Sequence, residues 1–64
     1  MKIPNNEKIS VNYIHQGVVD YISTYHTLKG KFTLYKIIGD DYQKIKTADT
    51  PIEFDEIIKK DRSK

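Results

Sequence analysis

The sequence predicts an α+β domain in the order helix, strand, strand, helix, with both helices packed on one face of a two-stranded antiparallel hairpin. Apolar residues recur every three or four positions between 11 and 28, which is typical of an amphipathic helix. Two runs rich in β-forming residues flank a Gly-Asp-Asp turn. A capping sequence precedes a second apolar stripe near the carboxyl end. The 64 residues suffice for one domain, 1–64, of which 1–7 and 61–64 are expected to fray.

The first predicted helix covers residues 11–28 and ends at Gly30, which readily takes a positive φ. Its apolar face would contain Val11, Ile14, Val18, Tyr21, Ile22, Tyr25 and Leu28. Gly17 would cost about 1 kcal/mol relative to alanine inside this helix. Apolar and polar residues alternate at 8–13, so a short strand there, followed by a helix from about residue 14, is a second interpretation.

Residues 31–38 and 42–48 are predicted to pair as a hairpin around the turn Gly39-Asp40-Asp41. A two-residue loop would place together Phe32, Leu34, Ile38, Ile45 and Thr47. The opposite face would then carry Lys31, Thr33, Tyr35, Ile37, Tyr42, Lys44 and Lys46. A three-residue loop would move Ile45 beside Tyr35 and Ile37. The shorter loop is favoured because it separates an apolar face from a lysine-rich one.

Residues 50–60 predict the second helix. Thr50 and Glu53 have the spacing of a capping box, and Pro51 would occupy the first helical position. The apolar stripe would be Phe54, Ile57 and Ile58. Two strands are few for a stable sheet, so either dimerisation or the strand at 8–13 is expected to complete it.

The residues indicate no catalytic, cofactor-binding or metal site. The chain has no cysteine, which rules out disulfides and cysteine-based zinc sites. His15 and His26 would lie too far apart on one helix to share a metal ion. Asp40 and Asp41 have the chemistry of a turn and lack calcium-loop spacing. The glycines are scattered and no serine has a nucleophile motif, so we expect a protein that is not an enzyme.

Two surfaces are candidates for binding a partner. The first is the second face of the hairpin, with Lys31, Tyr35, Ile37, Tyr42, Lys44 and Lys46 as candidate contacts. Lysine neutralises phosphates and tyrosine stacks on bases, while exposed tyrosine and isoleucine also suit protein interfaces. The second is an acidic patch of Asp49, Glu53, Asp55 and Glu56 at the start of the second helix, where the helix dipole already favours acidic residues.

Composition suggests the class of function. Lysine far outnumbers arginine, and isoleucine, asparagine and tyrosine are abundant, which indicates an AT-rich genome such as that of a low-GC bacterium or its phage. In size and general character, though in no specific residue, the chain resembles small phage and mobile-element proteins, including anti-CRISPR proteins. We therefore expect a cytoplasmic binding or inhibitory protein that occupies a surface of a larger protein or nucleoprotein.

The alternative function is a small DNA- or RNA-binding regulator that uses the hairpin. The net charge of +2 disfavours a DNA mimic, which needs a broad negative field. No membrane partner is expected, because the apolar runs are far shorter than the ~20 residues of a membrane span.

Overall fold

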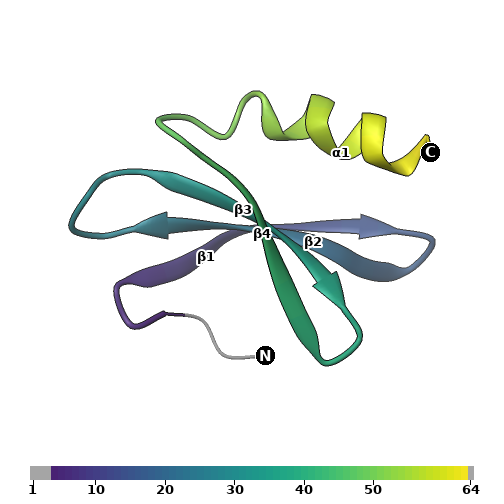
Figure 1. Ribbon diagram of the computed structural model, residues 1–64, viewed down its shortest axis with the longest axis horizontal. Helices are drawn as coiled ribbons and strands as arrows, with labels where there is room; N and C mark the ends of the chain where they lie inside the picture. The colour runs from purple at the N-terminus through teal and green to yellow at the C-terminus, as the bar shows by residue number, and fades with distance from the viewer. Residues whose placement is uncertain (1–3, 64) are drawn as a thin grey trace.

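The computed structural model describes residues 4–63, which form a four-stranded antiparallel sheet followed by one helix. The elements are β1 (Glu7–His15), β2 (Val18–His26), β3 (Phe32–Ile38), β4 (Asp41–Ala48) and α1 (Phe54–Arg62). Spatial order follows chain order, so the sheet is a meander with β1 and β4 at its edges. Figure 1 shows α1 lying along one face of the strongly twisted sheet. The predicted helix, strand, strand, helix order is therefore wrong.

The segment 11–28 forms a hairpin in place of the expected helix. Gln16 and Gly17 both have positive φ, 53° and 79°, as in the type I′ turns whose twist matches that of paired strands. Tyr21 and Ile22 are both buried, at 2% exposure each, and successive strand residues point to opposite faces. Apolar and polar residues do not alternate regularly along a strand that buries side chains on both faces. The apolar residues of this strand are spaced three or four apart, as they would be in an amphipathic helix. The alternative strand at 8–13 is present within β1, but no helix follows it.

The β3–β4 hairpin confirms the prediction for 31–38 and 42–48, including its two-residue loop, since Ile38 lies opposite Asp41. A bulge in β4 changes the face of the sheet on which the residues after Lys44 lie. Tyr35 lies opposite Lys44, but Leu34 lies opposite Lys46, so Ile45 is an extra residue in β4. Lys46 therefore shares the face of Leu34, and Thr47 lies opposite Thr33. Both residues lie on the faces opposite to those predicted.

The core lies between the sheet and α1. Its buried residues are Tyr21, Leu34, Phe54 and Ile58, with Tyr13, Phe32, Ala48 and Ile57 packed against them. The predicted stripe of the second helix is thus the face that packs on the sheet. The helix begins at Phe54, however, and the capping box does not form. Glu53 instead makes an ion pair with Lys46 at 3.0 Å.

The far end of α1 is tied to the sheet by polar contacts. Arg62 binds both carboxylate oxygens of Asp20, at 2.9 and 2.7 Å. Asp61 accepts hydrogen bonds from the Tyr21 hydroxyl and from Lys36 Nζ. These contacts hold the helix on one face and leave the opposite face of the sheet without a helix.

The two edge strands are irregular. The β1–β2 register shifts between Ile9 and Val11 and again between Tyr13 and Ile14, and β4 carries the bulge at Ile45. Bulged edges hinder the addition of a further strand from another chain. Partner contacts are therefore expected on a face of the sheet. Within residues 4–63, no helix combines the length and the apolar character that crossing a membrane would need.

Candidate functional site

The helix-free face is defined here by Ile22, Thr24, Thr33 and Tyr35 at its centre, on the side of the sheet away from α1. All four are buried, with exposures of 2%, 0%, 6% and 5%, although no helix covers them. Side chains of the flanking strands enclose them. The Tyr42 ring, for example, stands edge-on to the Tyr35 ring, with centroids 5.0 Å apart and planes at 89°. The face therefore has a closed centre, and its accessible groups lie around that centre.

Glu7, at the start of β1, forms the polar anchor of this face. Its Oε1 accepts hydrogen bonds from Thr24 Oγ1 at 2.5 Å and from the Tyr35 hydroxyl at 2.8 Å. Burial, together with the hydrogen bond and negative charge of Glu7, raises the pKa of the Tyr35 phenol well above its usual range. Within the part of the chain that the structure describes, no hydrogen bond or ion pair engages Glu7 Oε2. One oxygen is held in place while the other remains available to a ligand.

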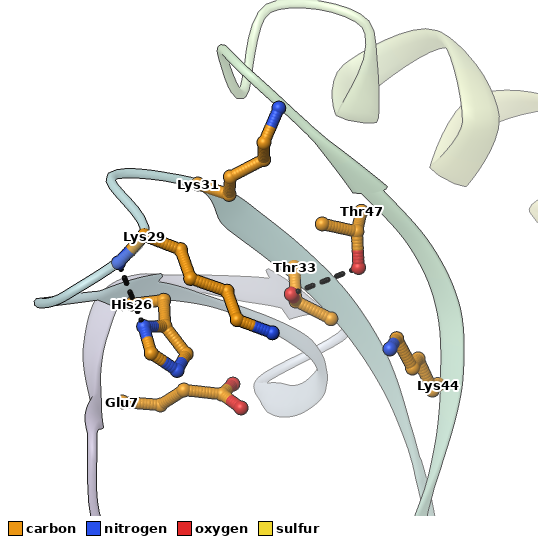
Figure 2. A pocket seen from close by; sticks show the side chains of 7 residues that line it. All are labelled: Glu7, His26, Lys29, Lys31, Thr33, Lys44 and Thr47. Atoms are coloured by element: carbon orange, nitrogen blue, oxygen red, sulfur yellow. Dashed lines mark hydrogen bonds between the residues drawn. The ribbon is translucent and has the colours of Figure 1, made fainter.

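A pocket of about 340 Å³ opens beside this carboxylate. It is lined by Glu7, His26, Lys29, Lys31, Thr33, Lys44 and Thr47. Figure 2 shows the Lys29 and Lys44 side chains reaching toward the pocket from different sides, with the Glu7 carboxylate below Lys29. The Lys31 side chain extends away, in keeping with its ion pair to Asp49.

The turn after β2 positions Lys29. His26 Nδ1 accepts hydrogen bonds from the backbone N–H groups of Leu28 and Lys29, at 3.3 and 3.1 Å. Gly30 closes the turn with a φ of 66° and donates its N–H to the His26 carbonyl at 2.9 Å. Because Nδ1 accepts, the neutral imidazole carries its proton on Nε2. The backbone that carries Lys29 is therefore fixed against β2.

Charge is distributed unevenly over the described residues. Four ion pairs are present: Lys31–Asp49, Lys36–Asp61, Lys46–Glu53 and Arg62–Asp20. None of the four involves Lys29 or Lys44. Both lysines therefore bring positive charge to the pocket without an ion-pair partner among the described residues, and Glu7 is the one acidic residue that lines it.

The structure separates the first set of predicted contacts. Lys44 lines the pocket, and Ile37 and Tyr42 lie opposite each other on the helix-free face, both partly buried. Tyr35 lies at the buried centre of this face and is too enclosed to stack on a base. Lys31 and Lys46 are held in ion pairs, Lys46 on the helix side of the sheet.

The predicted acidic patch is also divided. Asp49 and Glu53 are paired with lysines, at 2.5 and 3.0 Å. Asp55 and Glu56 are exposed in the first turn of α1, where they complement the helix dipole. No concentrated negative surface results from this arrangement.

Sequence reasoning missed Glu7, His26 and Lys29 as pocket residues. The sequence pattern predicts a frayed tail that includes Glu7, and it predicts that His26 lies in a helix with Lys29 at its end. The available signal was Gln16-Gly17, a turn dipeptide between two runs of β-forming residues. A hairpin predicted there would have brought the start of β1 beside the end of β2, where Glu7 pairs with His26.

Within residues 4–63, no three histidine, aspartate or glutamate side chains gather into a group that could hold a metal ion. Comparison of the chain with protein-family models, with curated proteins and with solved structures finds no match. The functional argument therefore depends on the pocket and its charges.

Proposed function

We propose that this chain is a non-catalytic, cytoplasmic nucleic-acid-binding protein that holds a phosphate backbone over the helix-free face. The observation that carries the proposal is the position of Lys29 and Lys44. Both reach the same pocket from different sides, and neither has a carboxylate partner among the described residues. An amino group without a carboxylate partner gains most from a phosphate and releases the counterions of the nucleic acid.

Neutral donors add to the positive charge. The hydroxyl oxygens of Thr33 and Thr47 are 3.1 Å apart and share one hydrogen bond across β3 and β4. Since each hydroxyl has one proton, one of the two retains a donor for a ligand. Phosphate oxygens accept hydrogen bonds from hydroxyls as well as from lysine. The pocket thus combines charge and hydrogen-bond donors of the type that backbone contacts use.

The test is fluorescence anisotropy with labelled single- and double-stranded oligonucleotides at low and at physiological salt. We expect binding that weakens steeply with salt. A double variant, Lys29→Gln with Lys44→Gln, should bind more weakly and lower the salt slope by about 1.4 for a single strand. The matched control replaces Lys59 and Lys60 of α1 with glutamine, which removes the same charge from exposed residues that do not line the pocket.

Absence of binding at low salt would refute the proposal. So would an equal loss of affinity in the pocket variant and in the control variant. In that case the response would reflect net charge alone and not the helix-free face.

A second candidate is the role of a binding or inhibitory protein that occupies a surface of a larger protein. It is favoured by the tip of the β1–β2 hairpin, where Ile14 lies opposite Val19, with exposures of 64% and 36%, and Val18, 64% exposed, lies on the other face. Adjacent exposed apolar side chains often mark protein contacts. A photo-crosslinker at Val18 should then capture a partner that one at Lys60 does not, and Val18→Asp should abolish the complex.

A further inference from the structure

We propose that the pocket takes one unpaired base that bears an exocyclic amino group, and that Glu7 is the residue that selects it. This inference rests on the proposed nucleic-acid binding and adds a preference for base type. Cytosine, which has such a group, would be accepted, whereas thymine or uracil would be disfavoured.

The selection follows from the chemistry of a fixed carboxylate. An ionised carboxylate accepts hydrogen bonds and donates none. It therefore pairs with the N4 amino group of cytosine and repels the O4 oxygen that thymine carries at the same ring position. Glu7 Oε1 is already held by Thr24 and Tyr35, so the carboxylate has little freedom to turn away. Oε2, which has no partner within residues 4–63, is the acceptor left for the base.

The surroundings suit a single base in an unpaired strand. A pocket of about 340 Å³ is at the small end of the range for ligand sites, roughly 300–1,000 Å³, and is no groove for a duplex. In a duplex the amino group is already paired, whereas single strands present their Watson–Crick edges to proteins. Lys29 and Lys44 at the same pocket offset the charge of Glu7 and can hold the phosphates that flank the base.

The experiment compares labelled oligodeoxycytidine and oligothymidine of about twelve nucleotides, a length within the usual site size of small single-strand binders. At neutral pH and low salt, we expect the cytidine strand to bind about tenfold more tightly, as one discriminating base contact supplies. Both strands have the same charge and ring size, but the two bases also differ at N3 and in the C5 methyl group of thymine. The N4-dimethylated strand described below therefore isolates the contribution of the exocyclic amino group.

The decisive variant is Glu7→Gln. It retains Oε1 as the acceptor for Thr24 and Tyr35 and places an amide donor where Oε2 was. Because that donor matches O4 of thymine, the cytidine preference should disappear or reverse. Circular dichroism and the thermal midpoint establish that the variant is folded. A second measurement needs no variant: cytidine strands whose N4 amino group is dimethylated should lose their advantage with the unaltered protein.

Each result has a distinct meaning. Equal, salt-sensitive binding of both strands would overturn the base selection and leave the phosphate contacts intact. A cytidine preference that survives Glu7→Gln in a folded variant would overturn the role of Glu7. Failure to bind either strand would overturn this inference together with the proposed function.

Discussion

Replacing Gly17 with alanine distinguishes the β1–β2 hairpin from a helix over residues 11–28. The substitution should destabilise the protein in a hairpin turn and stabilise it in a helix. In the structure Gly17 has a φ of 79° and follows Gln16 at 53°. A Cβ added to Gly17 would meet no atom within 4 Å, so no steric clash contributes. The cost is that of a left-handed backbone conformation, about 1–2 kcal/mol for an L-residue. Inside a helix, the same substitution would stabilise the protein by about 1 kcal/mol.

The measurement is thermal unfolding followed by circular dichroism. In a domain of this size, 1 kcal/mol shifts Tm by about 4–8 °C, so Gly17→Ala should lower Tm by roughly 4–16 °C. Gly39→Ala is the matched control. Gly39 has a φ of 60° and open space around it, and it lies in a turn under either interpretation of residues 11–28. A higher Tm for Gly17→Ala, with the expected loss for Gly39→Ala, would refute the β1–β2 turn.

Two further predictions concern stability. Phe54→Ala should lower the free energy of unfolding by about 3–5 kcal/mol in urea titrations, because Phe54, the first residue of α1, is fully buried in the core against the sheet. Ile52→Ala nearby should cost little, because Ile52 is 78% exposed, and similar losses for both would contradict the packing of α1. Burial and Glu7 raise the pKa of the Tyr35 phenol in the folded protein. Above pH ~10 the unfolded chain therefore loses the Tyr35 proton while the folded protein retains it. The free energy of unfolding should consequently fall as pH rises. Tyr35→Phe should remove the part of this decline that is due to Tyr35, and should lower the free energy of unfolding by about 1 kcal/mol at neutral pH. If stability falls equally at alkaline pH in the variant and the unaltered protein, the raised pKa of Tyr35 is contradicted.

The sequence predicts the structure of the carboxyl-terminal half of the chain more accurately than that of the amino-terminal half. The β3–β4 loop and the stripe of Phe54 and Ile58 were predicted from residues close in sequence, and the structure contains both. The start of α1 was placed too early because Glu53 pairs with Lys46 and caps nothing. A capping box and an ion pair compete for the same side chain. The outcome depends on the strand that lies beneath it.

The pocket could not be predicted from the same patterns. Glu7 contacts Tyr35 and Thr24, which lie 28 and 17 residues away in the chain. That contact requires β1, β2 and β3 to be neighbours, and a helix at 11–28 removes two of the three strands. The bulge at Ile45 then moves Lys46 to the helix side of the sheet, whereas Lys44, which lies before the bulge, stays on the helix-free face.

The sequence by itself determined the second hairpin and the apolar face of α1, because turn chemistry and a one-sided stripe are properties of a few adjacent residues. Tertiary structure decided that Tyr21 packs beneath α1 and Ile22 on the opposite face, so that a segment with helical spacing became two strands. It also decided which charges pair and which remain at the pocket. Burial on two faces and ion pairing both depend on contacts between distant parts of the chain, which local periodicity does not encode.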